Sequence, residues 1–262
     1  MTQPQDGPGD ADFVQSLARG LEVIKVFDAE HPYRSLSDVA KAADLSRAAA
    51  RRSLLTLHRL GYVRVEGSRF GLTPKTLELG HAYLRALSTP QIAEPHLTDL
   101  MRDVRETTAL SVLDGDDVVH VARVPVRGMI TVSIPVGSRF PAYATAMGRV
   151  LLAGLDEDAF GTYLERVDLQ PLTDHTVRDT EQLRAIITAA REEGYCVADQ
   201  ELNQSLRAVA VPVRDRSDVP IAAANIAAST GTRTLDELRA MVPRLRQCAG
   251  GIETDLRLVS GP

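Results

Sequence analysis

Hydrophobic positions in the first part of the chain recur every three or four residues, which predicts helices. Within residues 16–29 the apolar side chains follow helical spacing, and Ser16 is a suitable N-cap. We expect the inner side of this helix to consist of Leu17, Leu21, Ile24 and Phe27. Pro32 ends the helix region, because proline lacks the backbone N–H that a continuing helix needs.

A second and a third helix follow, separated by a tight break at DLS. Ser35 or Ser37 caps the second helix, whose apolar side is expected to be Leu36, Val39, Ala40 and Ala43. The third helix begins after its cap, Ser46, and ends near Leu60, where Gly61 supplies the stop.

After this helix the hydrophobic period changes to two, which predicts a hairpin. Polar residues on both sides of a Gly67–Ser68 turn alternate with Val63, Val65, Phe70 and Leu72. Three short helices, a tight turn between the last two, and then a hairpin follow the order of a winged helix-turn-helix. We therefore predict a DNA-binding domain of this fold over residues 13–73.

The remaining residues predict a connector and an α+β domain. Thr73 followed by Pro74 is a helix start, so a linker helix is expected from 74 to about 87, within a linker of residues 74–90. Residues 91–262 show paired strands with helices grouped between them, which favours an antiparallel sheet. Strands are expected in TALSVLDGDDVVHVARV, MITVSIPVG, RAVAVPVRD and IAAANIAAS, and the final helix is expected to bend at Pro243.

The composition favours an ordinary folded protein of one large or two modest domains. The chain has 262 residues, 44% of them hydrophobic, and no Trp. The first 12 residues are rich in Pro, Gly and acid, which predicts a disordered lead-in rather than a secretory signal. No window approaches the roughly 20 apolar residues of a membrane helix. Cys196 and Cys248 form no framework, so we expect two small buried residues in a cytoplasmic protein.

The charge distribution changes the picture of the third helix. The net charge is -5, yet residues 47–69 hold six arginines and one acidic residue, Glu66. Successive residues of a helix are about 100° apart, which divides this helix into two faces. The inner face is expected to be Ala50, Leu54 and Leu57, and the outer face Arg47, Ala48, Arg51 and Arg52.

An arginine and alanine face suits a helix that reads DNA. Arginine binds phosphate or pairs with guanine in the major groove, and alanine lets the backbone approach the base edges. Arg69 would lie at the tip of the wing, and Arg19 near the first helix start could touch phosphate. We therefore predict a DNA-contacting set of Arg19, Ser46, Arg47, Ala48, Arg51, Arg52, Ser68 and Arg69.

Two other interpretations of this region stay open at the level of the residues. The basic face could be solvated only, or the helix-turn-helix could serve dimerisation in a protein-interaction module. Only the DNA-binding interpretation predicts an affinity for DNA that falls steeply with salt.

Motifs of the common enzyme classes are missing from the chain. It has no GxSxG, no Walker loop and no GxGxxG opening a helix, and its six histidines are scattered without zinc spacing. The acidic DGDD at 114–117 lacks the ligand spacing of a calcium loop and is interpreted as a hairpin turn. We therefore predict no catalytic residues, no metal and no cofactor.

The best candidate for a ligand site is YATAMGR at 143–149. Thr145 is a possible cap for the helix that follows, and the free N–H groups of a helix start favour a carboxylate. Small side chains there let a ligand come close. The alternative is an ordinary helix entry packed on a sheet.

These segments together resemble the IclR family of bacterial transcription regulators. SLARGLEVIKVFDAEHPYRSLSDVAKAADLSRAAARRSLLTLHRLGYV is similar to its N-terminal domain, and VGSRFPAYATAMGRVLLA and GYCVADQELNQSLRAVAVPVRD to its effector domain, over about 13–258. SRAAARR, PAYATAMGR and VADQEL are closest to the branch that controls aromatic-acid catabolism through the β-ketoadipate pathway. The resemblance implies a winged helix joined to a GAF-like effector-binding and oligomerisation domain, in a homodimer or dimer of dimers on palindromic double-stranded operator DNA.

The resemblance also implies where an effector would bind. The family places it against the backbone at Ala146 and Met147, beside an apolar wall that corresponds here to Met129, Val132, Phe140 and Leu206. Polar contacts of the family fall on Ala198, Ala208, Asn225 and Ala227. Because three of these are alanine, the pocket is expected to be wide and weakly polar, which suits an aromatic acid better than a two- or three-carbon acid.

Other residues near the predicted pocket have open roles. Arg123, Arg139 and Arg207 are candidate partners for a carboxylate, although each is also a candidate surface or salt-bridge residue, and Asp199 is as well explained by a turn. An IclR-type regulator of a different small-acid or transport operon remains an alternative.

Overall fold

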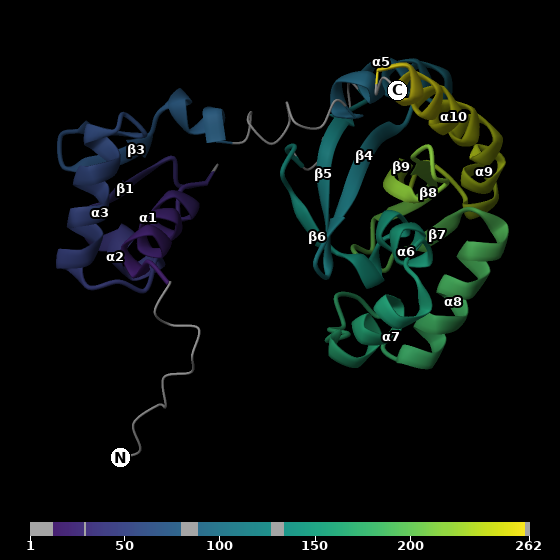
Figure 1. The fold of residues 1–262 in the computed structure, drawn as a ribbon, viewed down its shortest axis with the longest axis horizontal. Coiled ribbons are helices and arrows are strands. Elements are labelled where there is room, and N and C mark those ends of the chain that lie inside the picture. The colour runs from purple at the N-terminus through teal and green to yellow at the C-terminus, as the bar shows by residue number, and fades with distance from the viewer. Residues whose placement is uncertain (1–12, 29, 80–88, 127–133, 260–262) are drawn as a thin grey trace. The chain divides into compact units, whose positions relative to one another are not determined.

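The computed structural model describes residues 13–28, 30–79, 89–126 and 134–259, and they form two separate units (Figure 1). The first unit ends at Ala86 and the second begins at Leu87. In the first unit the elements are α1 Gln15–Lys25, β1 Tyr33–Ser35, α2 Leu36–Ala42, α3 Arg47–Arg59, β2 Val63–Glu66 and β3 Arg69–Leu72. The order confirms the winged helix-turn-helix.

The core of the first unit rests on α3. Ala50, Leu54 and Leu57 are buried against Val23 of α1 and Val39 of α2, so the predicted inner face is correct. Both predicted caps are also confirmed as hydrogen bonds: the Ser46 hydroxyl accepts from Ala49 N at 3.2 Å, and the Ser35 hydroxyl accepts from Asp38 N at 3.3 Å. The two caps fix where α2 and α3 begin and therefore how tight the turn between them is.

Two expectations for α1 are wrong. Val14, not Ser16, occupies the N-cap position, and it offers no side-chain hydrogen bond. Leu17 and Leu21 are 63% and 49% exposed, because only the side of α1 that carries Val23 meets the core of this unit. Helical spacing shows that a face is apolar, but it does not say what covers that face.

A short strand also escaped prediction. β1 pairs antiparallel with β3, so the wing is a three-stranded sheet in the order β1-β3-β2. The sequence predicted no strand at these positions, because a three-residue strand is too short to show a period. Gly71 lies opposite Tyr33 in this pairing, where a Cβ would come within 2.8 Å of the tyrosine ring.

The start of the predicted linker helix is partly described. The Thr73 hydroxyl accepts from Lys75 N, and Pro74–Thr76 form a 3-10 turn. Residues 80–88 lie outside the described residues, so the linker of 74–90 stays a prediction, as do the domain limits 13–73 and 91–262.

The second unit is a six-stranded antiparallel sheet with helices on both faces. Its strand order is β6-β5-β4-β9-β8-β7. The strands are β4 Thr107–Asp114, β5 Asp117–Val124, β6 Arg139–Pro141, β7 Cys196–Asp199, β8 Leu206–Arg214 and β9 Pro220–Ser229. The helices are α5 Thr89–Val104, α6 Ala146–Ala153, α7 Glu157–Arg166, α8 Thr180–Glu193, α9 Leu235–Ala240 and α10 Val242–Val259.

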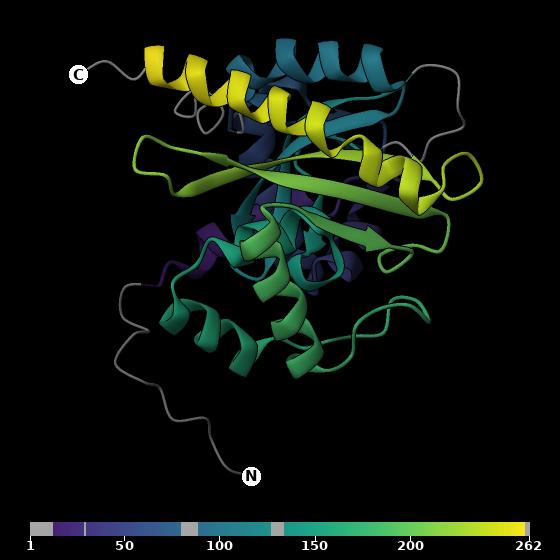
Figure 2. The same ribbon diagram turned by 90° about the vertical axis from the view of Figure 1, so that its right-hand side faces the viewer.

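The sheet separates two apolar cores. On one face α5, α9 and α10 cover residues such as Leu110, Val211 and Ile226, and on the other face α6, α7 and α8 cover Ala210 and Ala223. Figure 2 shows the long yellow α10 and the blue α5 on one side of the yellow-green strands and the green α7 and α8 on the other. The predicted α+β class with an antiparallel sheet is confirmed.

Four details of the second unit differ from prediction. α5 begins at Thr89, so Thr89 and Pro90, which were expected in the linker, are already helical. Residues 134–137 of the expected strand MITVSIPVG are not in a strand, and 127–133 lie outside the described residues. β7 had not been assigned, since four residues show little alternation. The final helix is not bent at Pro243 but is interrupted at Met241, which leaves Pro243 in the first turn of α10.

A close backbone approach fixes the start of α6. The Thr145 hydroxyl accepts from Gly148 N at 3.1 Å, as predicted for its cap. A Cβ on Gly148 would lie 2.2 Å from Ala142 O, which is backbone and cannot move aside easily. Only glycine therefore lets α6 begin directly against the turn that precedes it.

We expect Gly148→Ala to destabilise the second unit by about 1–3 kcal/mol or more, because the methyl group overpacks a backbone contact. Gly161→Ala in α7 is the matched control: nothing lies within 4 Å of its added Cβ, and alanine favours the helix by up to about 1 kcal/mol. Urea denaturation of the full chain measures both. Equal stability of the two variants would contradict the close approach.

Candidate functional site

The outer face of α3 is a row of exposed arginines. Arg47, Ala48, Arg51 and Arg52 are all exposed on the side opposite the buried Leu54. No ion pair or side-chain hydrogen bond engages these three guanidinium groups within the described residues. The face therefore offers free cations beside small side chains, which are the groups that binding to DNA in the major groove requires.

The other predicted DNA contacts have mixed environments. Ser68 and Arg69 are exposed at the β2–β3 turn, where Gly67 adopts a positive φ of 61°. Arg19 is half-buried on α1, and the Ser46 hydroxyl is already used as a cap although the residue is exposed. A phosphate contact of Ser46 would have to come from its backbone N–H or from the remaining hydroxyl capacity.

The second unit contains a cavity of about 650 Å³ beneath the start of α6. It lies between this helix and the sheet face that carries Ala109, Ala198 and Asn225. All of the predicted effector residues that the structure describes line it, namely Phe140, Thr145, Ala146, Met147, Leu206, Ala208, Asn225 and Ala227. Met129 and Val132 lie outside the described residues.

Much of the lining had not been predicted as a site, although Arg123 had been named as a candidate partner for a carboxylate. Ala109 and Thr107 come from β4, His120 and Arg123 from β5, and a loop after β7 adds Glu201, Leu202, Asn203 and Ser205. Ile134 also lines the cavity. Strand register places these residues together, and the register cannot be read from one strand alone. The alanines across the sheet explain why the cavity is wide.

The charges at the cavity do not cancel. Glu106 is buried and forms an ion pair with Arg233 at 2.7 Å, and Glu201 is buried and pairs with Arg149. Arg123 is half-buried and forms no ion pair among the described residues, and burial lowers the pKa of its guanidinium below the usual value. Among the described residues, the one uncompensated charge at the lining is therefore positive.

The other candidate arginines are engaged elsewhere. Arg139 pairs with Asp117 at 3.1 Å and also with Asp114. Arg207 pairs with Asp199 at 3.0 Å. Neither Arg139 nor Arg207 lines the cavity. These pairs confirm the salt-bridge interpretation for Arg139 and Arg207 and leave Arg123 as the free cation.

His120 is a neutral member of the wall. Its Nδ1 lies 2.6 Å from the Ser111 hydroxyl, and its ring packs edge-on against Phe140 at 5.3 Å. Burial, with a smaller contribution from Arg123, lowers its pKa to about 4. The ring is therefore uncharged at neutral pH and adds polarity without adding a second cation.

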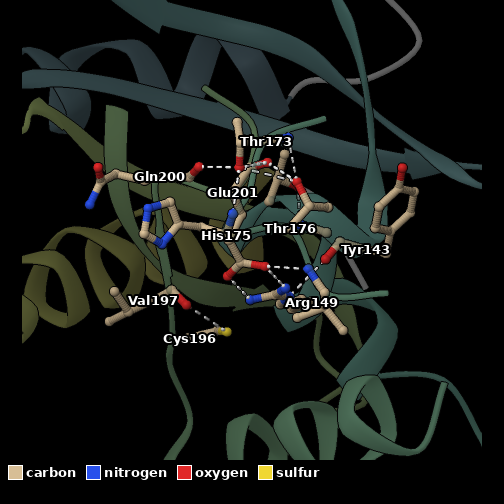
Figure 3. A network of polar contacts seen from close by, with 12 residues as sticks. Tyr143, Arg149, Thr173, His175, Thr176, Cys196, Val197, Gln200 and Glu201 are labelled. Atoms are coloured by element: carbon tan, nitrogen blue, oxygen red, sulfur yellow. Dashed lines mark hydrogen bonds and ion pairs between the residues drawn. The ribbon is translucent and has the colours of Figure 1, made fainter. Parts of the chain in front are cut away.

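A buried ion pair holds two sides of the cavity together (Figure 3). Arg149 of α6 is 1% exposed; its guanidinium donates to Glu201 Oε1 at 2.6 Å, to Glu201 Oε2, and to Tyr143 O at 2.8 Å. The backbone carbonyl of Glu201 in turn accepts from the Thr176 hydroxyl at 2.7 Å. The pair thus fixes the loop after β7 against the start of α6.

The acidic turn at 114–117 is a hairpin, as predicted. β4 and β5 join there through Gly115, whose φ is 63°. Asp116 pairs with Arg166 at 2.7 Å, while Arg139 holds the other two carboxylates. The described residues contain no group of three or more His, Cys, Asp or Glu able to hold a metal ion, and none of their helices is both long and apolar enough to cross a bilayer.

Family models match both units. Residues 16–67 match the model described as the IclR helix-turn-helix domain, and residues 81–254 match the bacterial transcriptional regulator IclR C-terminal domain. The second match alone spans more than half of the chain, so the likeness concerns the whole architecture and not one motif.

Two curated proteins to which the chain is similar are named as regulators. The chain is 42% identical over 231 residues to a Pca regulon regulatory protein of Pseudomonas putida, covering 88% of this chain and 79% of that protein. It is 34% identical to a p-hydroxybenzoate hydroxylase transcriptional activator of Acinetobacter baylyi, covering 84% and 83%.

Solved structures share the fold. A putative transcriptional regulator from Rhodococcus sp. RHA1 is 51% identical with a TM-score of 0.85, covering 94% of this chain and all of that one. An IclR homolog from Microbacterium hydrocarbonoxydans, solved in complex with 4-hydroxybenzoate, is 28% identical with a TM-score of 0.82, covering 93% and 100%.

We expect Glu201→Gln to destabilise the second unit by about 3–5 kcal/mol, because it leaves the buried Arg149 without a counter-charge. Replacing both partners, as Arg149→Met with Glu201→Leu, should recover much of this loss. Glu157→Gln is the surface control, since that carboxylate is 68% exposed and its pair with Arg184 contributes about 0–1 kcal/mol. The denaturant midpoints of the three variants measure these changes in stability. If Glu201→Gln were as stable as Glu157→Gln, the ion pair between Arg149 and Glu201 would not stabilise the second unit.

Proposed function

We propose that this chain, which belongs to the IclR family of bacterial transcription regulators, controls genes of aromatic-acid catabolism by binding an aromatic acid in the cavity under α6. Like its named relatives, the chain is a DNA-binding transcription regulator and not an enzyme. The observation that carries the finer proposal is the wide, alanine-lined cavity in which Arg123 is the one uncompensated charge among the described residues. An anion with an apolar body fits such a site.

Operator binding is assigned to the exposed face of α3. Arg47, Ala48 and Arg51 lie on the first two turns of the helix, the part that meets base edges and the phosphates beside them in helix-turn-helix proteins. Arg52 extends this face, and Arg69 at the wing tip and Arg19 on α1 contact the DNA backbone. The exposure and the free state of the α3 arginines support this assignment.

A homodimer would have the two-fold symmetry that matches a palindromic operator. The exposed apolar side of α1 consists of Phe13, Val14, Leu17 and Leu21, each at least 49% exposed. A contiguous apolar face of this kind favours a partner surface, and a second copy of the same helix satisfies it symmetrically. Two α3 helices would then meet two half-sites of a palindrome.

The effector would act by favouring one arrangement of the dimer. Ala146 and Met147 are buried at the start of α6 and line the cavity, so a bound effector would lie directly against this helix. An effector changes operator affinity only to the extent that it binds one state better than the other. The linker of 74–90 would transmit the difference between the states.

Replacing two exposed arginines of α3 tests whether this face binds DNA. We expect Arg47→Ala with Arg51→Ala to lower the affinity for the upstream region of the protein's own gene, and to reduce the slope of log K against log salt by about 2, since each phosphate contact contributes about 0.9. Arg102→Ala with Arg239→Ala, two exposed arginines of the other unit, should leave the slope unchanged. Gel-shift titrations at several salt concentrations measure both, and an unchanged slope in the first variant refutes the assignment.

Aromatic acids should change stability and operator affinity together. We expect 4-hydroxybenzoate or protocatechuate to raise the melting temperature, because a ligand bound to the folded state stabilises it, and to change operator affinity by about 5- to 150-fold. Operator DNA should change the affinity for the acid by the same factor. If these acids leave both quantities unchanged while a short-chain acid or β-ketoadipate alters them, the aromatic effector is wrong.

A further inference from the structure

Two polar side chains at the cavity have no partner in the part of the chain that the structure describes, and they lie on the same wall. Building on the proposed function, we infer that the cavity binds a hydroxylated aromatic acid along the sheet, with its carboxylate on Arg123 and its ring hydroxyl on Asn225. The inference names the chemical class of the effector and the two residues that select it.

Charge assigns the acid end of the ligand. Among the described residues, the charged side chains of the lining are Glu106, Glu201 and Arg123. Each carboxylate already has an arginine, Arg233 for the first and Arg149 for the second. A half-buried guanidinium without a counter-ion attracts an anion, and its planar pair of N–H donors matches a carboxylate.

Hydrogen bonding assigns the other end. Asn225 is 4% exposed, and its Oδ1 is buried without a hydrogen-bond partner. Its side-chain amide makes no hydrogen bond to any other described residue. An unpaired buried acceptor is costly, so the group it best accommodates is a donor supplied by the ligand, such as a phenol hydroxyl.

Strand register sets the distance between the two ends. Arg123 of β5 is the register partner of Ala109 of β4, and Ala109 is the partner of Asn225 of β9. The three residues therefore form one row across the sheet, with the end members about 10 Å apart at their Cα atoms. Ala109 is the smallest side chain with a Cβ and leaves room above the middle of the row, where a ring can lie between its two polar partners.

The rest of the wall agrees with this orientation. Ala208 and Ala227 lie beside the row, and their small side chains leave space for the ligand, while Phe140 supplies an apolar surface. His120 is neutral, since burial lowers its pKa to about 4, and therefore does not compete with Arg123 for the carboxylate. A two- or three-carbon acid would reach Arg123 but would leave Asn225 unpaired.

Calorimetric titration of the full chain with three probes tests the assignment. The probes are 4-hydroxybenzoate, benzoate, which lacks the hydroxyl, and 4-hydroxybenzamide, which lacks the charge. We expect the wild type to bind 4-hydroxybenzoate at least about tenfold more tightly than benzoate, because benzoate leaves Asn225 unpaired. Asn225→Leu, nearly equal in shape, should abolish this ratio and leave the benzoate affinity within about twofold.

The charged end has its own variant and control. Arg123→Gln should weaken both acids at least about tenfold and leave 4-hydroxybenzamide within about twofold. Arg102→Gln replaces an exposed arginine that pairs with Asp99 and does not line the cavity, and it should leave all three affinities unchanged. Melting of each ligand-free variant checks the fold, and Asn225→Leu should melt no lower than the wild type, because it removes an unpaired buried oxygen.

The outcomes separate this inference from the proposed function. If the wild type binds 4-hydroxybenzoate but Asn225→Leu and Arg123→Gln keep its affinity and its preference over benzoate, the two residues are wrongly assigned and the aromatic effector stands. If the wild type binds neither aromatic acid, both proposals fail.

Discussion

The site depends on the buried ion pair between Arg149 and Glu201. Glu201 belongs to the loop that forms one wall of the cavity, and Arg149 extends from the helix that forms its roof. Because a lone buried charge is costly, each partner holds the other in place, and the loop cannot move from α6 without exposing an unpaired arginine. The pair also uses the charge of Glu201, so that this carboxylate does not neutralise Arg123. Structural support and ligand selection therefore depend on the same contact.

In both units, paired charges leave a few arginines free to bind an anion. The chain carries a net charge of -5, but the α3 face presents Arg47, Arg51 and Arg52, which have no counter-ion among the described residues. Local free cations decide binding, because paired charges contribute little field at a distance. The exposed face of α3 has several unpaired arginines that suit a polyanion such as DNA, whereas the cavity has one that suits a single carboxylate. An acidic protein can in this way bind both DNA and an organic acid.

Periodicity predicted the parts of the fold that have enough length to show a period. Ala50, Leu54 and Leu57 were placed correctly because α3 is 13 residues long, whereas β1 and β7 have three and four residues and were missed. The resemblance to a family supplied the residues at the start of α6. The free state of Arg123 could not be predicted, since it follows from pairs such as Glu106 with Arg233, whose members lie 127 positions apart. The exposure of Leu17 was equally hidden, because sequence reveals an apolar face but not its partner.

The central claim is that one cavity of a transcription regulator selects a hydroxylated aromatic acid through Arg123 and Asn225. A crystal structure of the full chain with 4-hydroxybenzoate tests it most directly. The account predicts the carboxylate within hydrogen-bond distance of the Arg123 guanidinium, the ring above Ala109, and the hydroxyl donating to Asn225 Oδ1. A ligand in the reverse orientation, or one bound outside the cavity under α6, would contradict it.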